Sequence, residues 1–300
     1  MNAPMSSARL AGPSEGPRSP HSTPICNAFS VDVEDYFQVS AFENAVERAS
    51  WDHLEHRVEA NTRRILEMLD RHGVRSTFFT LGWVAERCPQ LVRDICASGH
   101  ELALHGYDHR RVTSQSELDF REDVRRSKGI LEEISGIEVI GYRAPSYSVV
   151  RQTLWALEIL LGEGLLYDSS IFPIRHDRYG IPDFPRFPQR VCERNGVHLM
   201  EFPLSTVRLA GVNLPFVGGG YLRHFPMWYV RWGMRRVNQI EGQPVVVYIH
   251  PWEVDPDQPR QQVGWRTRIR HYRHLQLTEP RLAELFEGFR FSTVKAVLGL

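Results

Sequence analysis

The sequence predicts an α/β fold with a mostly parallel sheet or barrel, and two observations carry this prediction. First, apolar runs of strand length alternate with segments of helical periodicity from residue 25 onward, which is the order typical of parallel sheets. Second, side chains that can bind metals or transfer protons, or pair with such groups, lie at or just beyond the C-terminal ends of predicted strands: Asp32, His105, Arg143, Asp168 and His250. Because the C-terminal ends of parallel strands share one face, we expect these side chains to converge on one site.

The first half of the chain shows both strand and helix patterns. In chain order the expected elements are a strand over 25–33, a helix over 54–69, a strand over 74–81, a helix over 89–97 and a strand over 101–104. Gly73 is a typical stop for the first helix, and Pro89 is typical of a helix start. The run 74–81 is rich in β-branched and aromatic residues, as strands are.

The second half continues the alternation. Its expected elements are a helix over 116–134, a strand over 139–142, a helix over 153–161, an extended segment over 165–167, a strand over 245–249 and a closing helix over 281–289. The sequence Ser116-Glu-Leu-Asp119 indicates a capping box at the start of the first of these helices.

Length and charge limit the organisation and the partners. The chain has 300 residues, with 36 Lys+Arg against 36 Asp+Glu. Five prolines among Ser, Gly and Ala predict a disordered tail over 1–24, and one catalytic domain is expected over 25–300. The balanced charge predicts no nucleic-acid partner and a neutral or zwitterionic substrate.

The compartment is predicted from features that the sequence lacks. We find neither the pattern of a signal peptide nor an 18-residue apolar stretch, which predicts no transmembrane segment. The four cysteines show no CxxC spacing and do not demand an oxidising compartment. We therefore expect a cytoplasmic location, with peripheral attachment to the inner membrane as an alternative. The sequence does not predict the oligomeric state.

The histidine pair in His105-Gly-Tyr-Asp-His109 is the sharpest chemical signal. Two imidazoles four residues apart on a helical turn lie about 5 to 6 Å apart and can bind one metal ion. The alternative is a chance spacing in a chain with 13 histidines. The position of the pair directly after a predicted strand favours a metal site.

A carboxylate cluster, Asp32-Val-Glu-Asp35, follows the first predicted strand. Three carboxylates at the end of a buried strand are costly unless a cation or hydrogen bonds compensate them. For Asp35 taken singly, a role in capping a helix is an equally good interpretation. With the two histidines, one carboxylate and a water would complete an open, hydrolytic zinc site.

Two further residues have the chemistry of a hydrolase site. Arg143, in Tyr142-Arg-Ala-Pro145, could pair with a carboxylate and favour its ionised form, or it could be an ordinary surface arginine. His250 follows an apolar strand and precedes Pro251 and Trp252. A core histidine without function is the alternative there.

The order of these motifs resembles the polysaccharide deacetylase family, the NodB homology domain of carbohydrate esterases, and more narrowly its branch in bacterial exopolysaccharide loci linked to exosortases. The matching segments in this sequence are 29–35, 76–80, 105–109, 141–145, 167–170 and 248–250. The resemblance covers the chain from about residue 27 and implies a distorted (β/α) barrel with fewer strands than a TIM barrel. A family-specific C-terminal extension is expected from about residue 200.

The resemblance implies hydrolysis of N-acetyl groups on N-acetylhexosamine units of a polysaccharide or its lipid-linked precursor, with a divalent metal for which zinc is the expected ion. Asp32 would be the general base, His250 the general acid and Arg143 the residue that orients the base. His105 and His109 would be metal ligands. Asp168 would tune the acid histidine, although Tyr-Asp-Ser-Ser can equally begin a turn.

The carboxylate ligand is where the sequence departs from the family. The family pattern has two adjacent aspartates, whereas here Val33 follows Asp32. On an extended segment Glu34 points to the same side as Asp32 and would be the ligand; if the chain turns sharply, Asp35 takes that place.

Other residues are expected at the substrate. Pro145, Tyr147 and Trp252 are predicted to contact the glycan. The glycine run 218–220 lacks the context of a phosphate loop and is expected to let the backbone approach the glycan or cross the mouth of the barrel. The many Arg and His residues over 256–275 predict a solvated and mobile arm. A simple surface loop and a lid over the substrate groove are the alternatives.

Two alternatives to a deacetylase remain open. The same fold could hydrolyse a small amide without metal, or the chain could be a catalytically silent glycan-binding protein.

Overall fold

The computed structural model describes residues 24–300, so the tail predicted over 1–24 lies almost wholly outside the described residues. Its strands are β1 Cys26–Val33, β2 Thr77–Thr80, β3 Glu101–Leu104, β4 Gly141–Tyr142, β5 Tyr167–Asp168, β6 Gln189–Arg194, β7 Val197–Glu201, β8 Thr206–Leu209, β9 Val212–Pro215, β10 Val246–Ile249 and β11 Arg290–Ser292. Its α-helices are α1 Val58–Arg71, α2 Gly82–Arg87, α3 Pro89–Ala97, α4 Glu117–Ser135, α5 Trp155–Gly162, α6 Gly219–His224, α7 Met227–Arg235, α8 Trp265–Tyr272, α9 Thr278–Gly288 and α10 Val294–Leu298.

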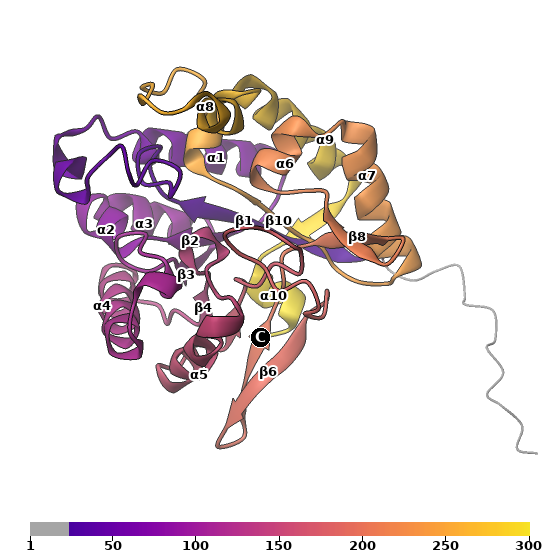
Figure 1. The fold of residues 1–300 in the computed structure, drawn as a ribbon, viewed down its shortest axis with the longest axis horizontal. Coiled ribbons are helices and arrows are strands. Elements are labelled where there is room, and N and C mark those ends of the chain that lie inside the picture. Colours follow the sequence, from indigo (N-terminus) through magenta and orange to yellow (C-terminus); the bar gives the residue numbers. More distant parts are fainter. Residues whose placement is uncertain (1–23) are drawn as a thin grey trace, which may run out of the picture.

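The main sheet has the predicted mostly parallel topology. Its order is β10-β1-β2-β3-β4-β5-β7-β6, with β11 beside the start of β1, and within this order only the β6–β7 pair is antiparallel. The helices surround the curved sheet, and the β6–β7 hairpin projects from it (Figure 1). β1 is buried on both faces, as expected for a central strand of a parallel sheet.

The curved sheet closes only approximately into a barrel. Strand β10 forms its edge, and the amide of Val246 donates to Oγ of Ser205, beyond β7, at 2.8 Å. A side chain thus bridges the two margins of the sheet. The predicted (β/α) barrel architecture is confirmed in this distorted form.

Helix α10 lies inside the curve of the sheet in Figure 1. The amide of Val294 donates to Oγ1 of Thr77, at the start of β2, and Glu101, at the start of β3, accepts from the amide of Lys295. The end of the chain therefore closes the N-terminal side of the strands. The opposite side, where the strands end, is left for a site.

Several predicted elements are confirmed with small shifts of their ends. α3 and β3 have the expected bounds, and α4 begins with the predicted capping box between Ser116 and Asp119. The predicted closing helix corresponds to α9, but β11 and α10 follow it. The two hairpins β6–β7 and β8–β9 were not predicted.

The segment over 256–275, predicted as a solvated and mobile arm, is exposed over most of residues 264–270 but is packed on the barrel near both of its ends. The segment contains α8, and the side chains of Gln258 and His271 are buried. Nε2 of His271 lies 2.7 Å from Oε1 of Gln258, and the His271 ring stacks on Trp252. Buried polar contacts of this kind hold the segment on the barrel.

The glycine run also has a structural explanation. A Cβ atom at Gly218 would lie 2.3 Å from the Tyr248 ring, and Gly218 has a φ of +91°. The backbone at Gly218 therefore lies close to a tyrosine of β10, and an approach to the glycan stays a prediction. Within residues 24–300, the helices are all too short or too polar to cross a membrane.

Candidate active site

The predicted strand-end residues surround a cavity of about 230 Å³ at the C-terminal ends of the strands. Asp32 lies at the end of β1, His105 directly after β3 and His250 directly after β10, and all three line it. Arg143, directly after β4, lies behind Asp32. The expected convergence is confirmed for these four residues and not for Asp168.

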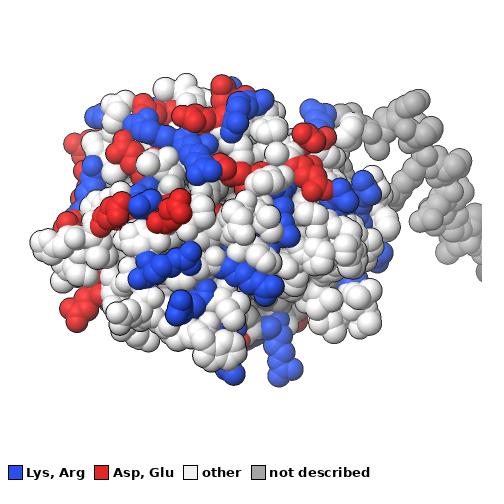
Figure 2. Space-filling view, turned by 90° about the horizontal axis from the view of Figure 1, so that it is seen from above, with Lys and Arg blue, Asp and Glu red and all other residues white. Residues whose placement is uncertain are grey.

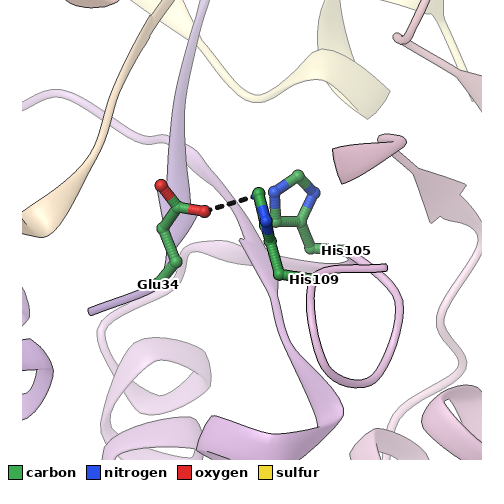
Figure 3. A group of neighbouring side chains, drawn as sticks. All are labelled: Glu34, His105 and His109. Carbon is green, nitrogen blue, oxygen red and sulfur yellow. Dashed lines mark ion pairs between the residues drawn. The ribbon is translucent and has the colours of Figure 1, made fainter. Parts of the chain in front are cut away.

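Glu34, His105 and His109 form a group that could hold a metal ion. Each offers one ligand atom, these atoms lie within 4.8 Å of one another, and all three side chains are buried (Figure 3). Oε2 of Glu34 approaches Nε2 of His109 to 2.7 Å, yet it makes no hydrogen bond among the described residues. A buried carboxylate oxygen of this kind is what a metal site requires, so the residues fit a divalent metal.

Neighbouring groups prepare these ligands for a metal. Nδ1 of His105 donates to the carbonyl of Arg143 at 2.7 Å, which leaves Nε2 free as the ligand atom. Burial lowers the pKa of His105 to about 4, so its imidazole is neutral at neutral pH. Nε1 of Trp252 donates to Oε1 of Glu34 at 3.1 Å and holds that carboxylate in place.

A loop brings His105 and His109 together, and not the helical turn that we expected. Residues 105–109 form no helix, and Gly106 and His109 have φ values of 76° and 56°. The two imidazole centroids still lie 5.4 Å apart. A left-handed backbone at His109 is uncommon for a non-glycine residue and is typical of functional sites.

The structure places Asp35 outside the ligand group. Its Oδ2 accepts from the amides of Arg57 and Val58 at 2.7 and 3.0 Å, and its Oδ1 accepts from the amide of Tyr36. Asp35 therefore caps the first turn of α1, the structural alternative considered for it. Glu34 is the carboxylate beside the two histidines, although the chain bends after Val33, where the amide of Glu34 donates to the carbonyl of Asp32.

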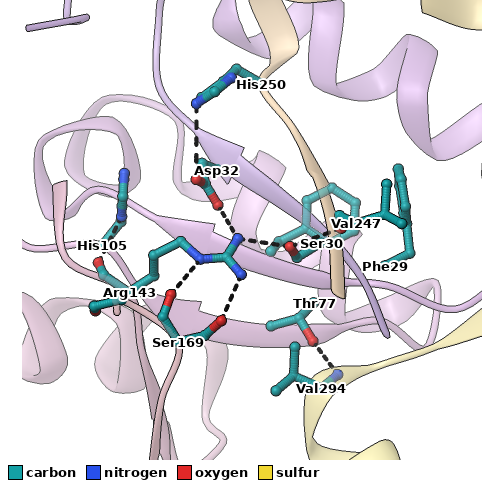
Figure 4. Close-up of polar contacts among 12 residues, drawn as sticks. Phe29, Ser30, Asp32, Thr77, His105, Arg143, Ser169, Val247, His250 and Val294 are labelled. Atoms are coloured by element: carbon teal, nitrogen blue, oxygen red, sulfur yellow. Dashed lines mark hydrogen bonds and ion pairs between the residues drawn. The ribbon is translucent and has the colours of Figure 1, made fainter. Parts of the chain in front are cut away.

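Asp32 and Arg143 form a buried pair at the floor of the cavity (Figure 4). Nη1 of Arg143 donates to Oδ1 of Asp32 and to Oγ of Ser30, both at 2.7 Å. Nε and Nη2 of Arg143 donate to the carbonyl and the hydroxyl of Ser169. The guanidinium is fixed at every nitrogen, and Oδ2 of Asp32 faces Nε2 of His250 at 3.9 Å.

A buried chain of charged residues supports His250. Nδ1 of His250 lies 2.7 Å from Oε1 of Glu253, and Oε2 of Glu253 accepts from Nε of Arg223 at 2.6 Å. Burial alone would lower the pKa of His250, but the bond to Glu253 and the nearby Glu34 and Asp32 raise it to about 9. His250 is thus protonated at neutral pH, as a proton donor must be.

The prediction that Asp168 tunes the acid histidine is wrong, because Glu253 has that position. Asp168 lies in β5, accepts a hydrogen bond from the Ser170 hydroxyl and is paired with Glu201 of β7. Burial raises the pKa values of both carboxyl groups, and Glu201 accepts from the amide of Ile171. The pair joins two strands and faces no part of the cavity.

Two of the three residues predicted to contact the substrate line the cavity, and the third does not. Tyr147 and Trp252 line the cavity, and Pro145 does not. The proline is buried and packs against Gly106 of the histidine loop. The sequence did not point to Tyr179, whose ring lies edge-on to Tyr147 and lines the cavity beside it.

Glu253 and Arg223 were also missed, although weak signals existed. Glu253 stands three residues after His250, within reach of a helical turn, and Arg223 ends the glycine-rich segment that begins at Gly218. No local pattern links these two residues, which are 30 positions apart.

Comparison with known protein families gives two matches. Residues 49–160 match the family model described as polysaccharide deacetylase, and residues 169–299 match a domain of unknown function, DUF3473. The extension predicted from about residue 200 lies within the second match, and its boundary stays a prediction.

Among curated relatives, the peptidoglycan-N-acetylglucosamine deacetylase of Bacillus cereus is 33% identical over 98 residues, 32% of this chain and 36% of the relative. A peptidoglycan deacetylase-like protein of Gibberella zeae is 34% identical over 110 residues, 36% of this chain and 32% of the relative. The chain thus spans about a third of the length of the curated relatives it matches.

Solved structures share the whole fold at low identity. A putative polysaccharide deacetylase from Mycobacterium smegmatis matches with a TM-score of 0.58 and 21% identity, over 94% of this chain and 90% of that one. Puue allantoinase matches with a TM-score of 0.59 and 15% identity, over 95% and 96%. These similarities support the fold, and the sequence match over 49–160 shows that this part of the chain is similar to the polysaccharide deacetylase family.

Proposed function

We propose that this protein is a metal-dependent N-deacetylase that hydrolyses N-acetyl groups from N-acetylhexosamine units of a polysaccharide or its lipid-linked precursor. One observation carries the proposal: the Asp32 carboxylate and the His250 imidazole lie 3.9 Å apart in a cavity that also contains a group of three metal-ligating side chains. The names of the curated relatives, a peptidoglycan-N-acetylglucosamine deacetylase and a peptidoglycan deacetylase-like protein, support the same reaction.

Each residue has a defined part in amide hydrolysis. Asp32 accepts the proton of the water that adds to the acetamide carbonyl, and Arg143 holds the carboxylate so that Oδ2 faces the cavity. His250 then donates its proton to the departing amine as the C–N bond breaks, and acetate and the free amine leave. Glu253 stabilises the protonated imidazole before this transfer.

The metal would be held by Glu34, His105 and His109. When bound, a divalent metal such as zinc supplies Lewis acidity toward the acetamide and toward water. Tyr147 and Trp252 offer apolar ring surface in the cavity, on which a sugar ring can pack.

The biological setting is part of the proposal. Resemblance to the branch found in exopolysaccharide loci supports a role in exopolysaccharide biosynthesis. We propose a cytoplasmic enzyme that works at the inner membrane, where a lipid-linked precursor would be its substrate.

Acetate release from N-acetylglucosamine oligomers tests the proposal. The purified chain should release acetate when loaded with Zn²⁺ or Co²⁺, lose this activity with a chelator and regain it with added metal. D32N should bind the metal but release acetate about 10² to 10⁴ times more slowly. Unchanged turnover after chelation would contradict the metal dependence, and binding without acetate release would indicate a silent glycan-binding protein.

A further inference from the structure

Two arginines flank the mouth of the cavity on opposite segments. Arg178 belongs to the loop over 172–180, and Arg270 belongs to α8, and both line the cavity. His176 also lines the cavity, and its ring stacks on Tyr179 with a centroid distance of 3.9 Å. Burial lowers the pKa of His176, and the charge of Asp177 raises it. The positive charges of Arg270 and Arg178 both lower this pKa, so both guanidinium groups lie near the same ring.

The other charged groups of the cavity have partners, and these two arginines do not. Asp32 is paired with Arg143, His250 with Glu253, and Arg111, the remaining arginine of the cavity wall, with Glu43. In residues 24–300 no carboxylate forms an ion pair with the side chain of Arg178 or Arg270, and both side chains are exposed. The two arginines thus leave positive charge at the mouth, where the nearby Asp177 contacts His176 and forms no ion pair with either of them. The net charge of the whole chain is zero.

The helix that carries Arg270 is held firmly beside the site. Arg223, the partner of Glu253, donates to the carbonyls of Arg270, His271 and Arg273 at 2.7 to 3.1 Å. These bonds satisfy the C-terminal carbonyls of α8 and tie its position to that of His250. Arg270 is therefore placed relative to the reacting groups by buried contacts, although its own side chain is exposed.

The surroundings of α8 strengthen the positive field. Residues 258–278 include five arginines and neither Asp nor Glu. Figure 2 views the molecule from the side on which α8 lies in Figure 1, and groups of basic side chains with few acidic ones between them occupy part of that face. A planar guanidinium pairs well with carboxylate and phosphate oxygens.

We propose that Arg178 and Arg270 bind a carboxylate or phosphate group that the substrate carries beside its N-acetylated sugar. The inference rests on the proposed deacetylase function and narrows its substrate class to anionic glycans. It replaces the neutral substrate that overall charge balance predicted, because local charge at the cavity mouth, and not net charge, acts on a bound ligand.

Three probes separate the sources of negative charge: neutral chitotetraose, a hyaluronan tetrasaccharide that carries carboxylates, and N-acetylglucosamine 1-phosphate. We expect kcat/KM of the metal-loaded enzyme to be higher for one of the charged probes than for chitotetraose. R178Q/R270Q should lower kcat/KM for that probe about tenfold, mainly through KM, and change it less than about twofold for chitotetraose. Raising the NaCl concentration from about 0.05 M to about 0.5 M should lower kcat/KM for the charged probe and leave kcat/KM for chitotetraose unchanged.

Matched controls come from the same segments. Arg175 lies in the same loop and Arg268 in the same helix, and neither lines the cavity. R175Q and R268Q should leave the preference for the charged probe intact. Titration calorimetry with the metal-loaded D32N variant should show the same order of affinities without turnover.

The outcomes distinguish the two proposals. A wild-type enzyme that deacetylates chitotetraose as well as both charged probes would overturn this inference and leave the deacetylase function standing. Equal losses in R178Q/R270Q and in the control variants would also overturn it. Absence of acetate release from every probe, with metal bound, would contradict the deacetylase function and this inference together.

Discussion

Nδ1 of His250 lies 2.7 Å from Oε1 of Glu253, and the second oxygen of the same carboxylate is bound by the buried Arg223. Burial alone would raise the pKa of Glu253, but Arg223 and His250 lower it to about 2, so it is charged throughout the neutral range. The contact to Glu253 is the first of the causes that raise the pKa of His250, ahead of the nearby Glu34 and Asp32.

The pH profile of E253Q follows from this contact. Protonated His250 is the donor, so activity should fall as the pH rises through the pKa of His250, about 9 in the folded protein. Removing the charge of Glu253 lowers that pKa, so the alkaline limb of kcat/KM should move to lower pH by about one unit or more. The measurement is kcat/KM against pH for the wild type and E253Q.

Asp168 provides the control, because it is a buried carboxylate without contact to His250. D168N should leave the alkaline limb where it is, even if the variant is less stable. A shift in D168N and none in E253Q would restore Asp168 as the residue that tunes the acid.

The adjacent carboxylates Glu34 and Asp35 should have separable effects. E34A removes one of three ligands and should abolish stoichiometric metal binding, measured by elemental analysis after dialysis. D35A leaves two backbone N–H groups at the start of α1, and that of Tyr36, without their acceptor and should lower the free energy of unfolding by about 2 kcal/mol. It should still bind metal with full stoichiometry.

Urea unfolding of the metal-free proteins checks the second half of this prediction. E34A should also lose some stability there, because it leaves Nε2 of His109 and Nε1 of Trp252 without their carboxylate partner. The two variants are therefore separated by metal binding and not by stability. A loss of metal in D35A at a temperature where the variant is folded would show that the ligand assignment is wrong.

R143K tests whether the fork geometry of the guanidinium matters. The lysine keeps the positive charge but cannot reach Ser30, Asp32 and Ser169 together. We expect kcat to fall about 10- to 100-fold, with bound metal unchanged, because His105 uses the backbone carbonyl of residue 143 and not its side chain. Steady-state kinetics with metal analysis measures both quantities, and an unchanged kcat would contradict the orienting role.

W252F tests the support of the metal carboxylate. Phenylalanine keeps an aromatic ring beside His250 and His271 but loses the N–H that donates to Glu34. The Kd for Zn²⁺, measured by competition with a chelator, should rise about tenfold. Trp83 is buried in the same hydrophobic core and has no contact with Glu34, so W83F should leave the Kd unchanged.

The sequence by itself determined most of the parallel strands and the residues at their ends, but neither the two hairpins nor β11. Buried β-strands and capped helices have local periodicities, which is why β3, α3 and the capping box of α4 were predicted with accurate bounds. Parallel strands end on one face, so Asp32, His105 and His250 were expected in one cavity from strand order alone.

Tertiary structure alone decided which groups assist them. Whether Glu34 or Asp35 faces the histidines depended on how the chain bends after Val33, and Asp35 became the cap of a helix 22 residues further on. The groups that support His250 come from separate elements: Glu253 from the helical turn after β10 and Arg223 from α6. No sequence period links these elements to each other or to α8. Arg178 and Arg270 likewise meet at the cavity only because a loop and a helix, each without any sequence signal for the other, fold against the same barrel.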